Sequence, residues 1–201
     1  MTFRVYFVTP DGASDDLVLA AVQGGATAVQ LRDKQASDAA MIAQARRLRA
    51  RLAPLGVPLI VNDRLAVVLA ARADGLHIGQ SDGDPLRMRA ALGPATILGL
   101  SIETGAQLAA VPPGAVDYLG IGPVRATATK PDHAAPLGMD GLARIVRAAP
   151  VPAVAIGGIG AADISELKQM GCAGIAVVSA IASAPDPEAA ARDLARTWSH
   201  A

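Results

Sequence analysis

Residues 28–34, Ala28-Val29-Gln30-Leu31-Arg32-Asp33-Lys34, show the pattern that decides the fold. A short, mostly apolar run ends in charged side chains, and residues 37–52 behind it have the period of an amphipathic helix. Short apolar runs that alternate with helical segments are typical of buried parallel strands joined by crossover helices. Eight such units predict an α/β fold, a single (β/α)8 barrel. The other runs are residues 5–9, 58–61, 75–78, 97–100, 117–121, 151–156 and 174–178, and residues 138–149 form a second clear helical segment.

The length and composition fit one barrel and exclude several classes of partner. The chain has 201 residues, 52% of them hydrophobic, so we expect a single domain over residues 1–201. Lys and Arg together number 18, as do Asp and Glu, which leaves no general basic field for nucleic acid or an anionic membrane. Aromatic residues make up only 2% of the chain, which argues against a stacking platform for single-stranded nucleic acid.

Targeting and membrane segments are not predicted. Residues 1–10 run into the first strand and lack the basic region and cleavage site of a signal peptide. The longest uncharged stretch, residues 169–185, is interrupted by glycines and is shorter than the about 20 apolar residues that span a bilayer. These features predict a cytoplasmic protein. The single cysteine, Cys172, is expected to be a small buried hydrophobic residue.

The end of the second run supplies a candidate site for phosphate groups. In a barrel of this kind, the groups that follow the strands meet at one rim, where chemistry is placed. Alternation along the strand sends Gln30, Arg32 and Lys34 to the same side, toward the barrel mouth. Two cations and an amide suit the oxygens of a phosphate or diphosphate. The alternative is a surface ion pair with Asp33 or nearby acids.

Two carboxylates follow neighbouring strands. Asp63 comes after Asn62 at the end of the third run, and Asp82 lies just past the fourth, with no obvious cation between them. Such a pair repels unless it shares a metal or a proton, and oxygen ligands with room for substrate phosphate favour Mg²⁺. Asp63 could instead cap a helix that begins at Arg64, whereas Asp84 is the expected cap for the helix at Pro85.

A second phosphate site is predicted after the seventh and eighth runs. Gly157-Gly158 and Ser179 follow the two strands from which these barrels commonly build an amide-lined phosphate cradle. Glycine pairs also occur in turns for conformational reasons alone. His77 either contacts substrate or is a polar side chain satisfied in the core. Residues 125–136, with no usable period, are expected to form an active-site lid.

These motifs together resemble the thiamine-phosphate synthase family across nearly the whole chain. The resemblance implies a transferase that joins an aminopyrimidine diphosphate to a thiazole phosphate. The motifs that carry it are Val5-Tyr6-Phe7-Val8-Thr9, Gln30-Leu31-Arg32-Asp33-Lys34, Ile60-Val61-Asn62-Asp63, Gly75-Leu76-His77-Ile78-Gly79-Gln80-Ser81-Asp82, Asp117-Tyr118-Leu119-Gly120-Ile121-Gly122-Pro123-Val124, Thr127-Ala128-Thr129-Lys130, Ala155-Ile156-Gly157-Gly158-Ile159 and Val177-Val178-Ser179-Ala180-Ile181.

The resemblance also implies roles for individual residues. Mg²⁺ would be held by Asp63 and Asp82, and Gln30 and His77 would lie near the pyrimidine. The catalytic residues that hold the diphosphate would be Arg32, Lys34, Asn62, Ser101 and Lys130. The phosphate of the thiazole substrate would be bound by Thr127, Thr129, Gly158, Val178 and Ser179.

The chain departs from the family pattern at three places. It has Pro10 where the family often has an aspartate after the first strand, and Arg125-Ala126 where the family has Phe-Pro. It also has Ser101-Ile102-Glu103-Thr104 in place of Ser-x-His-Thr.

Other readings of the motifs remain open. A thiazole tautomerase or a non-catalytic phosphate-binding barrel would not need two unpaired carboxylates. A Schiff-base aldolase would want a lysine inside a strand, whereas Lys130 lies past the sixth run. Small-molecule substrates are the expected partners, and the oligomeric state is left open, with a homodimer compatible.

Overall fold

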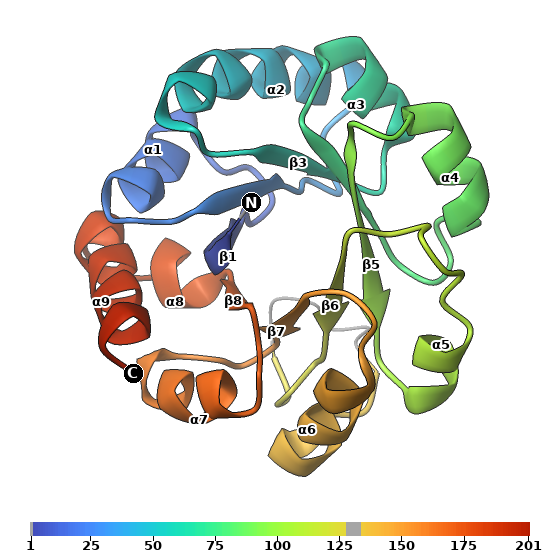
Figure 1. Ribbon diagram of the computed structural model, residues 1–201. Helices are drawn as coiled ribbons and strands as arrows, with labels where there is room; N and C mark the ends of the chain where they lie inside the picture. Colours follow the sequence, from blue (N-terminus) through green and yellow to red (C-terminus); the bar gives the residue numbers. More distant parts are fainter. Residues whose placement is uncertain (1, 128–133) are drawn as a thin grey trace.

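The computed structural model describes residues 2–127 and 134–201, in which eight parallel strands close into a barrel (Figure 1). Each strand pairs with its neighbour in sequence, and β8 pairs with β1 to complete the ring. This arrangement confirms the predicted (β/α)8 fold. The strands are β1 (Phe3–Val8), β2 (Ala28–Leu31), β3 (Leu59–Asn62), β4 (Gly75–Ile78), β5 (Ile97–Ile102), β6 (Tyr118–Ile121), β7 (Ala153–Ile156) and β8 (Gly174–Val177).

The fifth strand is longer than the sequence pattern predicts. Ser101 lies inside β5 and not after it, because Ser101 and Ile102 stay in register with Gly120 and Ile121 of β6. The polar side chain of Ser101 therefore does not mark the end of β5, because pairing with β6 continues through it. Asn62 is likewise the last residue of β3 and not the first residue beyond it.

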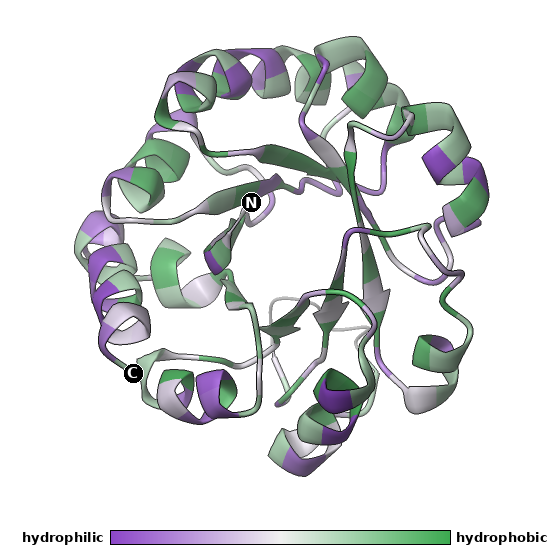
Figure 2. Ribbon diagram, in the orientation of Figure 1, coloured by the Kyte–Doolittle hydropathy of each residue, from purple (hydrophilic) through white to green (hydrophobic). Residues whose placement is uncertain are grey.

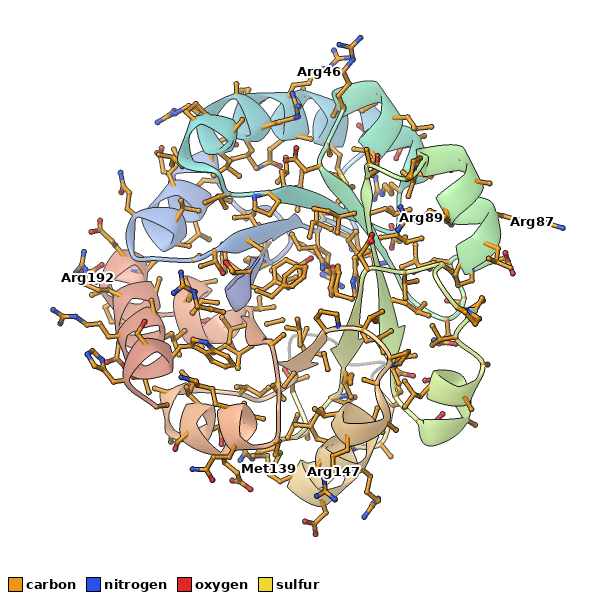
Figure 3. All side chains as sticks on the ribbon, in the orientation of Figure 1. Arg46, Arg87, Arg89, Met139, Arg147 and Arg192 are labelled. Carbon is orange, nitrogen blue, oxygen red and sulfur yellow. The ribbon has the colours of Figure 1, made fainter. Side chains whose placement is uncertain are left out.

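Helices form an outer ring around the barrel (Figure 1). Hydrophobic residues line the strands and the inner helix faces, and hydrophilic residues lie outside (Figure 2). The side chains of Arg87 and Arg192, for example, point away from the barrel (Figure 3). Among the described residues, no helix is both long and apolar enough to cross a membrane. The helices are α1 (Asp15–Gln23), α2 (Asp38–Leu52), α3 (Leu65–Ala71), α4 (Pro85–Leu92), α5 (Gly105–Ala109), α6 (Gly138–Ala148), α7 (Ile164–Gln169), α8 (Ser179–Ala182) and α9 (Pro187–His200), with 3-10 turns η1 (Ala53–Leu55) and η2 (Ala161–Asp163).

Side-chain caps begin several of these helices. The Ser37 hydroxyl accepts a hydrogen bond from the Ala40 amide at the start of α2. The Asp84 carboxylate accepts one from the Arg87 amide at the start of α4, 2.9 Å away, which confirms the predicted cap. These oxygens satisfy amides that have no partner within the helix, so each helix starts at a defined residue.

Cys172 lies in the turn before β8 and is buried, as predicted. Burial raises the pKa of its thiol to about 11. The reactive thiolate is therefore scarce at neutral pH, which is consistent with a packing role.

The barrel interior is filled by alternate residues of the strands. Phe3 and Tyr6 of β1 and Tyr118 of β6 form a cluster of rings inside the barrel, and the Phe3 and Tyr118 ring centroids are 4.3 Å apart. The Tyr118 ring occupies the space above Gly99 of β5. A Cβ atom on Gly99 would lie 2.1 Å from Cζ of Tyr118, so a side chain at position 99 and the tyrosine ring exclude one another.

We therefore predict that Gly99→Ala destabilises the barrel by displacing Tyr118. Overpacking of a dense core typically costs about 1–3 kcal/mol. Urea unfolding should show a lower midpoint with an unchanged slope. Gly105→Ala is the matched control, since a Cβ there meets no atom within 4 Å. Equal stability of the two variants would contradict this account of the interior.

Candidate functional site

A cavity of about 860 Å³ opens at the carboxyl ends of the strands. Every strand contributes to its wall, from Tyr6 and Val8 of β1 to Ala176 and Val177 of β8. Most of the site residues expected from the sequence meet here. Those that line the cavity are Gln30, Arg32, Lys34, Asn62, His77, Asp82, Ser101, Thr127, Gly158, Val178 and Ser179. Thr129 and Lys130 lie outside the described residues.

The cations after β2 face the cavity, as alternation predicts, and each has an acidic partner. Nη1 of Arg32 lies 2.9 Å from Oδ1 of Asp11, which also accepts the Lys34 amide at 3.0 Å. Asp33 points elsewhere and accepts the amides of Gly12, Gln35 and Ala36. The ion-pair alternative is therefore correct for nearby acids and wrong for Asp33. A ligand with several negative oxygens would have to compete with Asp11 for Arg32.

Asp11 is a site residue that the sequence analysis missed. It stands one position after Pro10, the position at which the family often has an aspartate. Its position shortly after β1, where rim residues are expected, could have indicated that it lies near the site.

No obvious cation was expected between the two carboxylates, but Asp63 has cationic neighbours, Lys34 among them. Nζ of Lys34 contacts Oδ2 of Asp63, and Nε of Arg64 lies 4.0 Å from Oδ1 of the same residue. The lysine reaches across from the end of β2 to the end of β3, a contact between neighbouring strands that sequence spacing does not show. The predicted alternative for Asp63 is also wrong, because α3 begins at Leu65 and its N-cap is Arg64, without a side-chain cap.

Of the two predicted metal ligands, Asp82 lines the cavity, whereas Asp63 is not among the lining residues. Asp63 has a φ of 48°, a left-handed conformation that is unusual for a residue other than glycine and is enriched at functional sites. Oδ2 of Asp82 accepts the Gly79 amide at 2.7 Å, which fixes its carboxylate at the cavity wall. Within the described residues, no group of three or more His, Cys, Asp and Glu side chains could hold a metal. Two carboxylates with substrate oxygens and water suit Mg²⁺ better than a fully protein-bound metal.

His77 is buried at the centre of a chain of hydrogen bonds. Its Nδ1 lies 2.8 Å from the Tyr118 hydroxyl, and its Nε2 lies 2.9 Å from Oγ of Ser101. Burial lowers the pKa of His77 to about 4, and the charge of Asp82 opposes this only in part. The ring is therefore neutral at physiological pH. The interpretation of His77 as a polar side chain satisfied by protein groups is therefore correct. His77 also lines the cavity, and its contact with substrate stays a prediction.

Tyr6 and Tyr118 were not assigned a role from the sequence. Their hydroxyls lie 2.8 Å apart, and Nε2 of Gln30 donates to the Tyr6 hydroxyl at 2.8 Å. Burial raises the pKa of both phenols, so each keeps its proton. The chain has only these two tyrosines, each inside a mostly apolar strand. A phenol in a buried strand needs a hydrogen-bond partner, which was the signal for a polar cluster.

The glycine turn after β7 lines the opposite side of the cavity. Gly157 and Gly158 have φ values of 96° and 67°. A Cβ on Gly157 would lie 2.6 Å from Cα of Pro123, so the turn packs directly against the segment after β6. The conformational interpretation of the glycine pair is therefore correct, and Gly158 and Ser179 also line the cavity. The phosphate cradle stays a prediction.

Comparison with known proteins identifies the family. The family described as Thiamine monophosphate synthase matches residues 5–181. The chain belongs to the thiamine monophosphate synthase family. Similar proteins of this family include the thiamine-phosphate synthases of Xanthobacter autotrophicus, 52% identical over 87% of this chain and 83% of the relative, and of a Psychrobacter species, 47% identical over 94% and 92%.

Solved structures agree with this assignment. Thiamine phosphate pyrophosphorylase from Pyrococcus furiosus superposes with a TM-score of 0.89 and 31% identity, over 98% of this chain and 96% of that protein. A 3-hexulose-6-phosphate synthase structure has a TM-score of 0.70 at 16% identity, which reflects the shared barrel alone. The thiamine monophosphate synthase family is thus supported by sequence and by structure.

Arg125, one of the departures of this family member from the usual pattern, joins two sides of the site. Its Nη1 donates to the Gly158 carbonyl at 3.0 Å, and its Nη2 lies 2.7 Å from Oδ1 of Asp163 in η2. The hydrogen bond from Arg125 lowers the pKa of Asp163, although partial burial opposes the shift. Arg125 thereby ties the start of the predicted lid, residues 125–136, to the glycine turn. The lid itself stays a prediction, because residues 128–133 are outside the described part of the chain.

We predict that Asp163→Asn lowers stability at neutral pH but not in acid. Because the pKa of Asp163 is lowered in the folded protein, its stabilising effect is fully present above the usual aspartate pKa of about 3.9. That effect disappears as the pH falls through the lower folded-state pKa. Urea unfolding of both proteins across this range measures the difference. The exposed Asp193 on α9 provides the control, Asp193→Asn. A difference that stays constant with pH would contradict the proposed ion pair.

Proposed function

We propose that this chain condenses 4-amino-2-methyl-5-(diphosphomethyl)pyrimidine with 4-methyl-5-(2-phosphoethyl)thiazole, or its carboxylated form, to give thiamine phosphate and diphosphate. The observation that carries the proposal is the division of one cavity into two polar sides. Cations and carboxylates follow β2 to β4, and a glycine turn follows β7 on the opposite side of the barrel. Such a cavity suits two phosphorylated small molecules held together.

The residues after β2 and β3 would assist departure of the diphosphate. The bond between the pyrimidine methylene and the diphosphate oxygen breaks, and its electron pair leaves with the diphosphate. Arg32 and Lys34 stabilise the negative charge that develops there, and Asn62 and Ser101 offer further polar contacts from the same wall. The thiazole nitrogen then forms the new bond to the methylene carbon. No protein nucleophile is needed, so positioning and electrostatics supply the rate.

The metal site is part of the proposal. Asp63 and Asp82 would hold Mg²⁺, which would neutralise charge on the departing diphosphate. Lys34 contacts Asp63 and also lines the cavity, so a bound diphosphate would compete with Asp63 for its ammonium group. Cation binding at Asp63 and diphosphate binding at Lys34 should therefore favour one another.

The alternative activities have less support. The tautomerase and a non-catalytic barrel leave the carboxylates and cations after β2 to β4 without a use. A Schiff-base aldolase lacks its lysine among the described residues, where Lys34 follows β2 and Lys168 lies on α7. The roles of Lys130 and Thr129, a cytoplasmic location and a homodimer remain predictions.

The direct test is an assay with both substrates and Mg²⁺, followed by the mass of the product. Thiamine phosphate and diphosphate in equal amounts are expected. Consumption of the thiazole phosphate without release of diphosphate would instead indicate the tautomerase.

We predict that Asp82→Asn lowers kcat/KM by more than tenfold, which corresponds to about 1.4 kcal/mol of barrier. The amide can still accept the hydrogen bond from Gly79, so the turn is kept while the charge that would hold the metal is lost. Activity is measured over a Mg²⁺ titration. Asp84→Asn, two residues away, retains the helix cap and should leave activity unchanged. Full activity of Asp82→Asn at moderate Mg²⁺ would overturn the metal assignment.

We also predict that Ser179→Leu weakens binding of the thiazole phosphate by about tenfold or more, because a bulky side chain would enter the cavity beside the glycine turn. The pyrimidine diphosphate should bind nearly as before. Calorimetric titration with each ligand separately measures both effects. Ser183→Leu, at the exposed far end of α8, is the control. Equal losses for both ligands would contradict the two-sided arrangement.

A further inference from the structure

Five polar side chains form a continuous row of hydrogen bonds inside the barrel. In order they are Gln30, Tyr6, Tyr118, His77 and Ser101, and we call this row the polar relay. Its four contacts measure 2.8, 2.8, 2.8 and 2.9 Å. The first four side chains are at most 8% exposed, and the contacts of the relay give each of them a protein partner. In such a place an unpaired hydroxyl hydrogen costs about 1–3 kcal/mol.

The first member decides the direction of the relay. The amide nitrogen of Gln30 can only donate, so the Tyr6 hydroxyl accepts from it. Tyr6 then has one hydrogen left, and its remaining partner is the hydroxyl of Tyr118. If Tyr6 donates to Tyr118, the hydrogen of Tyr118 is free to bind Nδ1 of His77. The hydroxyl hydrogens of both tyrosines then have acceptors within the relay.

The opposite direction leaves a buried hydrogen without an acceptor. If Nδ1 of His77 carried the ring proton, it would donate to Tyr118, and Tyr118 would donate to Tyr6. Tyr6 would then accept from both Gln30 and Tyr118, and its own hydrogen would have no acceptor in the relay. The hydrogen bonds therefore favour a neutral imidazole with its proton on Nε2, which donates to Oγ of Ser101.

We propose that Tyr6, Tyr118 and His77 are positioning residues that aim the hydroxyl hydrogen of Ser101 into the cavity. Because Oγ of Ser101 accepts from Nε2 of His77, its own hydrogen is available to a ligand and not to the histidine. An anionic oxygen of the diphosphate group is the ligand that this donor suits. The assignment of the diphosphate rests on the proposed function, whereas the direction of the relay does not.

The relay also gives Gln30 a defined orientation. With its nitrogen on Tyr6, the carbonyl oxygen of the amide is left as an acceptor at the cavity wall. The two ends of the relay thus present opposite groups to the cavity, an acceptor at Gln30 and a donor at Ser101. A ligand that bears an amino group and a diphosphate matches both ends.

The first test needs no substrate. Long-range ¹H–¹⁵N correlation spectra of the ¹⁵N-labelled protein at neutral pH distinguish a protonated from an unprotonated ring nitrogen of His77. We expect Nδ1 without a proton and Nε2 with one. The reverse tautomer would mean that the Gln30 amide is turned round, and it would overturn the proposal. Because the wild-type protein is used, the result does not depend on whether a variant folds.

Two tyrosine variants provide a matched comparison in the same spectra. Tyr118→Phe removes the donor to Nδ1 and should abolish the single tautomer, whereas Tyr6→Phe leaves the hydroxyl of Tyr118 free to donate and should preserve it. Both keep the ring and remove one buried hydroxyl, so a general effect of lost packing would act on both. Loss of the tautomer in Tyr6→Phe alone would contradict the proposed direction.

Diphosphate binding tests the role of the hydroxyl. The probe is inorganic diphosphate with Mg²⁺, titrated calorimetrically into the wild-type protein, Tyr118→Phe, Ser101→Ala and the double variant. Tyr118→Phe should weaken binding about three- to tenfold, the size of one hydrogen bond. In the Ser101→Ala background the same change should have no further effect, because Tyr118 acts through Ser101. Additive losses would overturn the proposal.

These outcomes separate the relay from the proposed function. An Nε2 proton and non-additive diphosphate binding, in a protein that does not form thiamine phosphate, would support the relay and reject the synthase activity. Synthase activity together with a proton on Nδ1 of His77 would support the proposed function and reject the relay.

Discussion

Closure of the sheet is the constraint on which the rest of the structure depends. The pairing of β8 with β1 removes both sheet edges and forces alternate residues of all eight strands into one narrow interior. The residues at the carboxyl ends of the strands are thereby brought to a single opening. Helix α9, which packs against α1 and β1, covers the seam where the last unit meets the first. Lys168 holds the end of that helix by donating to the carbonyls of Trp198 and Ala201.

The narrow interior explains why each polar side chain within it has defined packing neighbours and hydrogen-bond partners. The ring of Tyr118 occupies the place of a side chain at Gly99, and a Cβ on Gly120 would lie 3.1 Å from Cε1 of His77. Two glycines therefore make room for two polar rings. Once these rings are buried, each hydroxyl and ring nitrogen must be paired within the barrel. Packing and hydrogen bonding are thus inseparable at the floor of the cavity.

Charge pairing at the rim has a different character. Arg32 with Asp11 and Lys34 with Asp63 are partly exposed ion pairs, and such pairs contribute little to stability. They keep a cluster of like charges compatible with the folded state, and they can be exchanged at modest cost. Rim residues that are held by exchangeable partners can change partners when a charged ligand binds, as the proposed function requires. The buried relay below them would orient that ligand.

Much of this protein is determined by local sequence. The alternation of short apolar runs with helical segments determined the barrel, because each run must be buried on both faces. The same alternation correctly placed Gln30, Arg32 and Lys34 on the cavity wall. Contacts between strands were decided only by the tertiary structure. Lys34 reaches Asp63, and Ser101 stays within β5. Tyr6 contacts Tyr118, which lies 112 residues further along the chain. Closure of the ring brings such residues together, although no period in the sequence relates them.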